Sequence, residues 1–315
     1  MLKFLKGLYL PKIANCLFIK KYMYKTFLLI LFFITVNNYS QDKYEYFGAV
    51  KLNGSDKTII SYRLVFSENS GAIKGYSVTD LGGDNETKNI ITGTYNRKTK
   101  EIKFREETIL YTKSKYSQDM FCFVNFSGKV KLVESNTKLE GDFKGLYKNN
   151  KKCIDGTLAL IGSNKLYKLL NKINNKIQKS TKVDEAVKQK VNPITILDSL
   201  KVNNLIKGQN LNVFTKYDSM VLEIWDSKDE DGDVINLYNN DKLILENYTI
   251  RNKKKKITIN VEKGQNIFTI EATDEGSLKP NTAMIQLVDQ DRTFELMSNL
   301  KKGEKASITI NKLVD

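Results

Sequence analysis

An acidic stretch from Asp226 to Asp233, DSKDEDGD, is the densest group of potential ligands in a chain that is otherwise basic. Carboxylates are the hard oxygen donors that calcium prefers. Crowding them into one loop also creates a repulsion that a cation would relieve. These residues favour a structural calcium site in which backbone carbonyls complete the coordination shell, and its candidate ligands are Asp226, Asp229, Asp231 and Asp233.

The spacing within this stretch does not match an EF-hand. Placing Gly232 at the obligatory glycine position puts Ser227 at position 1 and Tyr238 at position 12, where Asp and Glu are required. Asp231-Gly232 is also a strong hairpin-turn signal. A plain polar turn and a weak calcium site of the extracellular type therefore both stay open.

Catalytic arrangements are scarce in this sequence. The chain contains no histidine, which excludes Ser-His-Asp and Cys-His catalysis and any His-ligated zinc or haem. Glu106 and Glu107 are adjacent, and neighbours on a strand point to opposite faces, so they are unable to flank one scissile bond. No catalytic residue is predicted, and a hydrolase that uses dispersed Asp and Glu residues is the only enzyme hypothesis left.

The N-terminal region has the pattern of a secretory signal peptide. Lys25 precedes the apolar run Phe27–Val36, and polar residues follow up to Ser40, which predicts a signal peptide over residues 1–40 with cleavage after Ser40. Met23 is a more natural start, which would make residues 1–22 an extension of the gene model. Ten apolar residues span about 15 Å as a helix, too little to cross a bilayer. We expect an exported chain, periplasmic or extracellular, with no transmembrane span after cleavage.

Export changes the interpretation of the cysteines. Without the leader only Cys122 and Cys153 remain, and an even pair in an oxidising compartment favours a disulfide. In a barrel one strand would separate them, which predicts a Cα separation of about 9–10 Å against a limit of about 7 Å. The bond therefore requires Cys153 to lean in from the preceding loop.

Residues 41–163 show a strand pattern. Apolar and polar side chains alternate, as at Ile60, Tyr62, Leu64 and Phe66, and turn-forming residues separate the runs. The eight expected strands are Tyr44–Leu52, Thr58–Glu68, Ala72–Asp80, Glu86–Asn96, Glu101–Tyr111, Met120–Leu132, Lys138–Tyr147 and Cys153–Ile161.

A weak repeat of the form apolar-x-Gly-x-apolar places Gly93, Gly141 and Gly156 on the apolar faces of these runs. Glycine there indicates strong curvature or a close backbone approach, which favours a small closed antiparallel barrel over the alternative, a β-sandwich. Eight strands joined by short loops resemble the lipocalin or calycin architecture. Such an interior either holds a ligand or is filled by its own side chains; the candidate lining residues are Tyr62, Leu64, Phe66, Tyr95 and Phe104.

Residues 164–193 lose the strand pattern. Leu166, Leu169, Leu170, Ile173 and Ile177 recur at helical spacing, which predicts an amphipathic helix over 164–177. It either packs on the barrel or binds a membrane surface or a partner. The charged, unpatterned segment that follows, up to the Asn-Pro at 192–193, is predicted to be a linker.

Residues 194–315 return to short β runs spaced about ten residues apart, which favours an antiparallel β-sandwich. The expected strands are Met220–Trp225, Val234–Tyr238, Lys242–Glu246, Lys256–Glu262, Ile267–Ala272, Ala283–Val288, Thr293–Met297 and Ala306–Ile310.

Charge selects no partner. Beyond residue 40 there are 45 basic and 36 acidic residues, a net charge of +9. The basic tip Arg251–Lys256 contains no aromatic residue on which a base would stack, which disfavours nucleic acid as a partner.

Several stretches carry a resemblance. IKGYSVTDLGGDNETKNIITGTYN, FCFVNFSGKV and CIDGTL in the first half, and WDSKDEDGDVINLYNNDKLILENYTI in the second, are similar to uncharacterised secreted bacterial proteins with two β domains. The resemblance implies secretion and β architecture, and that group has no established activity to transfer.

We therefore expect a secreted, non-catalytic binding or cell-surface protein, whose partner is a surface polymer, a protein or an envelope component. The alternatives are a barrel that carries a small apolar ligand and a carboxylate-dependent hydrolase. No cofactor is expected apart from the candidate calcium ion.

Overall fold

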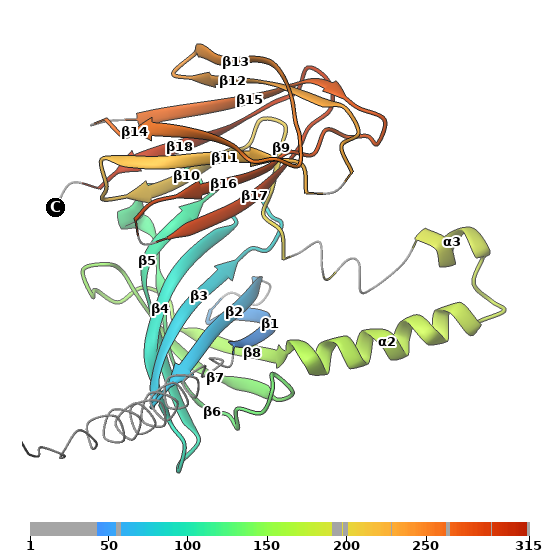
Figure 1. Cartoon of the computed structure of the whole chain (residues 1–315). Coiled ribbons are helices and arrows are strands. Elements are labelled where there is room, and N and C mark those ends of the chain that lie inside the picture. The colour runs from blue at the N-terminus through green and yellow to red at the C-terminus, as the bar shows by residue number, and fades with distance from the viewer. Residues whose placement is uncertain are drawn as a thin grey trace, which may run out of the picture. The chain divides into compact units, whose positions relative to one another are not determined.

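The structure is a computed structural model, which describes residues 43–54, 58–190, 197, 201–227, 229–262, 265–290 and 292–313. The predicted signal peptide lies outside the described residues. Residues Asp42–Asp315 form one compact unit. The fold is mainly β, as the sequence predicts (Figure 1).

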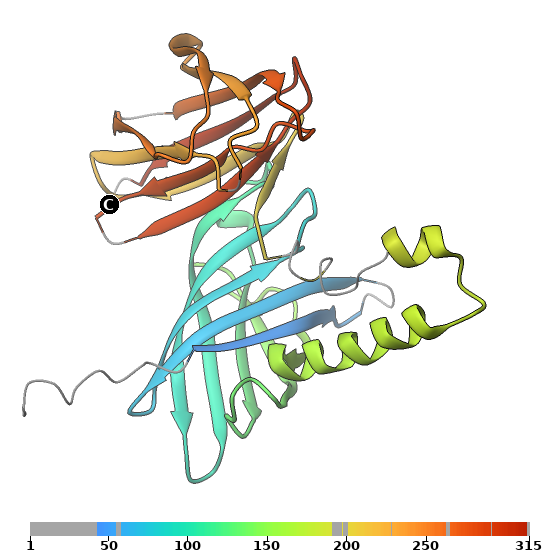
Figure 2. The same cartoon turned by 45° about the vertical axis from the view of Figure 1, so that its right-hand side comes forward.

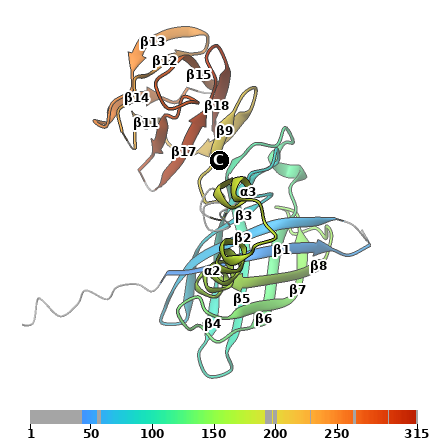
Figure 3. The same ribbon diagram turned by 90° about the vertical axis from the view of Figure 1, so that its right-hand side faces the viewer.

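A closed eight-stranded antiparallel barrel forms the first part of this unit. Each strand pairs with the next one along the chain, including β5 with β6, and the pairing of β8 with β1 closes the barrel. The neighbouring strands β1, β8 and β7 can be followed in Figure 3. The strands are β1 (Lys43–Leu52), β2 (Ile59–Asn69), β3 (Ala72–Thr79), β4 (Thr87–Asn96), β5 (Glu101–Thr112), β6 (Phe123–Lys129), β7 (Lys138–Leu146) and β8 (Gly156–Gly162).

The barrel forms because the alternating side chains bury one face of every strand. Tyr62, Leu64 and Phe66 on β2 are at most 1% exposed and belong to one buried cluster with inward residues of the other strands. A Cβ atom on Gly93 would lie 2.1 Å from the Lys103 carbonyl oxygen of β5. This glycine therefore permits the close backbone approach that the sequence indicates.

One helix of 17 residues, α2 (Ser163–Lys179), continues directly from β8 and leads away from the barrel strands (Figure 2). A short helix, α3 (Glu185–Lys190), follows in the segment that the sequence predicts as an unpatterned linker. Among the described residues, no helix is long and apolar enough to cross a membrane.

Two facing sheets form the second part of the unit. One runs β13-β12-β15-β18-β10 and the other β14-β11-β16-β17-β9. Leu222 and Ile224 of β11 share a buried cluster with Phe268 and Ile270 of β15, so the two sheets pack face to face. The strands are β9 (Asn204–Ile206), β10 (Asn210–Thr215), β11 (Ser219–Trp225), β12 (Asp233–Asn239), β13 (Lys242–Thr249), β14 (Lys255–Asn260), β15 (Gln265–Glu275), β16 (Met284–Val288), β17 (Thr293–Asn299) and β18 (Lys305–Lys312).

This sandwich is not purely antiparallel. Strands β9 and β10, which the sequence pattern misses, pair in parallel with β17 and β18. Strand β10 also pairs with the end of β5 through Val213 and Tyr111, which joins the barrel strands to one sheet of the sandwich.

Candidate functional site

A cavity of about 520 Å³ occupies one end of the barrel. Strands β1, β3, β5 and β7 end at this end of the barrel, and strands β2, β4, β6 and β8 begin there. Most of the lining residues lie at these strand ends or in the loops that join them. Most of the wall is apolar. The apolar lining includes Val50, Leu52, Ile60, Phe121, Phe143 and Ile154.

Glu106 on β5 is the buried acid of this cavity. Its side chain points inward and the residue is only 5% exposed. Oε1 accepts hydrogen bonds from the Tyr62 hydroxyl at 2.9 Å and from Ser77 Oγ at 2.5 Å, and Oε2 accepts one from the Val124 backbone N–H at 2.8 Å. Three strands, β2, β3 and β6, thus supply donors to one carboxyl group on β5.

Alternation along β5 directs Glu106 inward, in line with Ile102 and Phe104, and a β-bulge follows it directly. The register of β4 and β5 pairs Ile91 with Glu106 but Ile90 with Thr108, so Glu107 is the extra residue. Glu107 makes its contacts on the other side of the strand, with Arg105 at 2.6 Å and Thr92 Oγ1 at 2.5 Å. The two glutamates therefore do not form a pair, as the sequence predicts.

The electrostatics of the site follow from burial. Desolvation raises the pKa of Glu106, and hydrogen bonds from Ser77, Val124, Tyr62 and Asn89 oppose that rise without cancelling it. Burial and the neighbouring carboxylate raise the pKa of the Tyr62 phenol well above its usual range. Tyr62 therefore stays a neutral donor at physiological pH.

Asn89 supplies a second acceptor. It is 5% exposed and lines the cavity, opposite Ser77 in the β3–β4 register. Because its side chain donates to Glu106, its amide nitrogen is oriented toward the carboxylate, and Oδ1 has no hydrogen-bond partner among the described residues. Of the described residues lining the cavity, Asp80 and Glu106 are acidic and none is Lys or Arg.

The five residues proposed from sequence to line a ligand cavity lie in the packed barrel core. Tyr62, Leu64, Phe66, Tyr95 and Phe104 are 0–8% exposed and belong to one cluster. None of them is in the cavity wall, although the Tyr62 hydroxyl reaches Glu106. Ligand contact by these five stays a prediction.

The missed residues are Ser77, Asn89 and Glu106. Each is a polar side chain at an inward position of an otherwise apolar strand face. That interruption of the alternation is a signal that the sequence contains.

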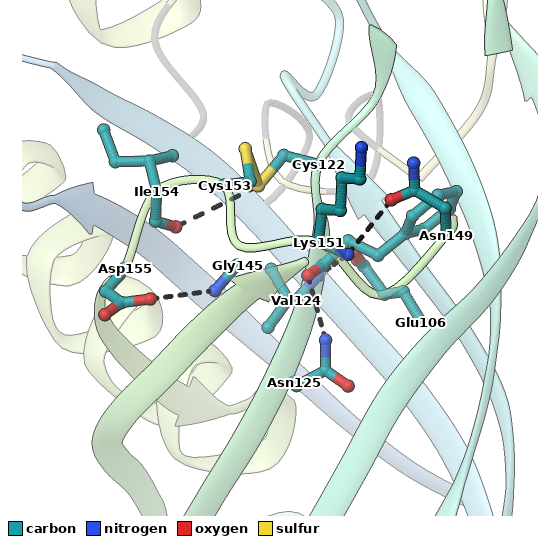
Figure 4. The surroundings of a disulfide bond; sticks show 11 residues. Glu106, Cys122, Val124, Asn125, Gly145, Asn149, Lys151, Cys153, Ile154 and Asp155 are labelled. Carbon is teal, nitrogen blue, oxygen red and sulfur yellow. Dashed lines mark hydrogen bonds between the residues drawn. A yellow bond between two sulfur atoms is a disulfide. The ribbon is translucent and has the colours of Figure 1, made fainter. Parts of the chain in front are cut away.

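The disulfide between Cys122 and Cys153 is present, with its Cα atoms 6.0 Å apart (Figure 4). The expected separation of about 9–10 Å for strands one apart does not apply, because Cys153 lies before β8 begins and crosses toward Cys122 over β7. Its N–H donates to the Gly145 carbonyl at 2.8 Å. A Cβ atom on Gly145 would lie 2.0 Å from the Ile154 oxygen and 2.6 Å from Cys122 Sγ, so only glycine leaves room for this crossing.

The acidic loop connects β11 to β12. Asp226 and Asp233 are buried, Asp231 is half-buried and Asp229 is exposed. The pKa of Asp233 is raised to about 6 by burial and by the nearby carboxylates of Asp231, Asp226 and Asp274. Within the described residues, no group of three or more His, Cys, Asp or Glu side chains is placed to hold one metal ion. Calcium binding stays a prediction.

Comparisons with known proteins supply no relative for this chain. No protein-family model, no curated protein and no solved structure matches it.

Proposed function

We propose that this protein is a non-catalytic binding protein that holds a small amphiphile in the mouth of its barrel. The observation that supports this most is the 520 Å³ cavity whose apolar wall surrounds two buried acceptors, Glu106 and Asn89. Ligand pockets typically measure about 300–1,000 Å³ and combine an apolar lining with a few convergent polar groups.

The chemistry of the polar end follows from the two acceptors. Asn89 Oδ1 has no donor among the described residues, and Glu106 is a carboxyl group in a lining without a described cation. An unpaired buried acceptor destabilises the protein, and a ligand N–H or O–H would relieve that cost. We therefore infer a ligand with an apolar body and a hydrogen-bond-donating head, an amine before an alcohol, and not a carboxylate.

The mouth of the cavity suits the entry of an apolar body. Ile59 and Tyr116 line its rim and are 70% and 64% exposed, and Met120 nearby in the sequence is also exposed. Exposed apolar groups gathered at an opening are typical of ligand entrances and interaction sites.

A hydrolytic function has less support. Hydrolysis by carboxylates needs two acids that converge on one bond. The second acid in the described lining, Asp80, accepts a hydrogen bond from the Asn85 N–H through Oδ2 and so stabilises its own turn.

Export of the protein to the periplasm or the medium remains part of the proposal, and the sequence pattern of residues 1–40 is its support.

Binding is tested with N-phenyl-1-naphthylamine, a neutral apolar fluorophore with one N–H donor. We expect its fluorescence to rise on binding to the Asp42–Asp315 unit and to fall on adding decylamine. Decanol should compete less well and decanoate least, because Glu106 and Asn89 offer acceptors and no cation.

Two tryptophan variants locate the dye. Ile60→Trp adds a large side chain to a half-buried cavity residue and should abolish the signal, whereas Val133→Trp places the same side chain at an exposed position away from the lining and should leave it intact. Equal signals from both variants, or no binding by the unaltered protein, would refute a ligand in the barrel.

A further inference from the structure

The apolar stripe of α2 is not buried by the rest of the protein. Ser163 is the only buried residue that the helix contributes. Leu169 and Ile173, at the centre of the stripe, are 43% and 47% exposed, and Leu166, Leu170 and Ile177 are only half-buried. The stripe predicted from sequence is therefore available to a partner over most of the helix, which runs clear of the barrel strands in Figures 1 and 2.

A row of lysines runs beside this stripe. The five lysines recur at steps of three and four residues, which places them along one side of a helix at about 100° per residue. Residues 163–179 contain no Asp or Glu. In the part of the chain that the structure describes, none of the five forms an ion pair. They are Lys165, Lys168, Lys172, Lys176 and Lys179.

We propose that this face of α2 binds the surface of a membrane that is rich in anionic phospholipid. An amphipathic helix with lysines on its polar side lies in the plane of the interface, with its apolar side chains among the acyl chains and its lysines at the headgroups. Seventeen residues give a helix about 25 Å long, so several headgroups are in reach of the lysine row.

The charge of α2 argues against a second copy of this chain as the partner that covers its exposed face. Two such helices would bring two lysine rows together with no acidic residue on either helix to neutralise them, which is unfavourable. A bilayer with anionic headgroups supplies both an apolar medium and the opposite charge. The lysine row runs beside the apolar stripe along the whole helix. A flat charged membrane surface can therefore contact both at once over the full helix length.

Vesicle sedimentation tests the proposal with the Asp42–Asp315 unit, which excludes the apolar run Phe27–Val36 as a cause of binding. We expect the protein to pellet with phosphatidylcholine vesicles in which about a quarter of the lipid is phosphatidylglycerol, and to stay in solution with pure phosphatidylcholine. Raising the salt from about 0.05 M to 0.5 M should release it, because screening weakens attraction between charges at the surface.

Two variants address the two parts of the surface. Ile173→Asn removes an exposed apolar side chain and should weaken partitioning at least tenfold. Replacing Lys168, Lys172 and Lys176 by Gln should weaken it about fivefold per lysine, on the order of 100-fold in total. The matched control replaces Lys74, Lys98 and Lys148, which are exposed elsewhere, and has the same net charge. It should retain most of the binding.

Three outcomes would overturn the proposal. The first is equal binding to neutral and anionic vesicles, or none to either. The second is equal loss in the α2 triple variant and its control, which would indicate a general charge effect. The third is a dimer in solution without vesicles that Ile173→Asn dissociates, which would make a second copy the occupant.

Discussion

The Tyr62 hydroxyl donates a 2.9 Å hydrogen bond to Glu106 Oε1 inside the barrel, where the two residues are 0% and 5% exposed. At a pH above the folded pKa of Glu106, replacing Tyr62 by Phe removes a donor from a buried carboxylate, and a hydrogen bond to a charged group contributes about 1.5–3 kcal/mol. We expect Tyr62→Phe to lower the free energy of unfolding by about 2 kcal/mol.

Tyr46→Phe is the matched control, because Tyr46 is equally buried and its hydroxyl bonds Thr137 Oγ1 at 3.0 Å, a neutral partner. Its expected cost is about 1 kcal/mol. Urea denaturation measures both variants. Equal losses would show that the charge on Glu106 adds nothing to the Tyr62 bond.

The pKa of Glu106 gives stability a particular pH dependence. Burial raises this pKa in the folded protein above the usual value of 4.5. Above pH 4.5 the folded protein therefore holds a proton that the unfolded chain releases, so this contribution to stability is full at lower pH and is lost as pH rises through the folded pKa. Glu106→Gln should remove that loss, because the neutral side chain accepts from Val124 and donates to the hydroxyls of Ser77 and Tyr62.

Glu107 is the control with the opposite sign. Burial tends to raise its pKa, but the hydrogen bonds from Arg105 and Thr92 outweigh that effect and lower it. Its contribution is present at neutral pH and is lost as pH falls through the lowered pKa. Unfolding free energies of Glu106→Gln and Glu107→Gln between about pH 3 and 8 should therefore diverge from the parent in opposite directions. Parallel profiles would contradict the raised pKa of Glu106.

The Cys122–Cys153 bond closes a loop of 31 residues. Restricting the unfolded chain over that length stabilises the folded state by about 3–4 kcal/mol in the entropic model. We expect Cys122→Ser with Cys153→Ser to lower the free energy of unfolding by that amount, and reductant to lower that of the parent similarly. A double variant whose denaturation midpoint matches the oxidised parent would show that the bond contributes no stability.

Gly145 determines whether this bond has room. A Cβ at this position would meet the Ile154 oxygen and Cys122 Sγ within 2.6 Å, and overpacking of this kind costs about 1–3 kcal/mol. Gly145→Ala should therefore destabilise the protein and leave more free thiol after oxidative refolding, as a thiol-reactive dye measures. Gly54→Ala is the comparison, because Gly54 has a positive φ of 76° but open space around it. It should cost only about 1–2 kcal/mol and leave no extra thiol.

Local pattern was sufficient to predict the strands of the barrel and the course of α2. Alternation along β2 and turn residues such as Asn69-Ser70-Gly71 act over a few residues, so the expected and observed ends agree within about three residues in most strands. Strand β9 has only three residues, and β10 alternates, with Leu211, Val213 and Thr215 buried, over only six residues. Both have parallel partners far along the chain.

The candidate site depends on contacts between strands, which the sequence does not display. Ser77 and Asn89 face each other only through the β3–β4 register, and Glu106 lies near them because the β4–β5 register pairs it with Ile91, the inward position of β4 next to Asn89. The proximity of the two cysteines likewise depends on the missing side chain at Gly145. The residue types show which side chains could bind a ligand or form a disulfide. Only the folded chain shows which of them lie next to one another.

The acidic loop leads to the last prediction. Asp231 Oδ1, Asp233 Oδ1 and Asn281 Oδ1 are buried oxygen atoms without a hydrogen-bond partner among the described residues. Hydrogen bonds bring them to one region, because Leu278 N–H donates to Asp231 and Thr282 N–H donates to Asp233. The Asn281 amide group is oriented unambiguously, since its Nδ2 donates to the carbonyls of Val234 and Asp274.

Oxygen atoms of this kind suit calcium, whose shell combines carboxylate, carboxamide and carbonyl ligands. We expect millimolar calcium to raise the melting temperature, with a dissociation constant of about 0.1–1 mM and about 1–3 kcal/mol of stabilisation by mass action. Asp231→Asn with Asp233→Asn should abolish the rise, whereas Asp241→Asn, in an exposed turn of φ 64° that Asn tolerates, should not. A melting curve that is identical in calcium and in chelator would leave DSKDEDGD as a turn between two strands, held by its own backbone contacts.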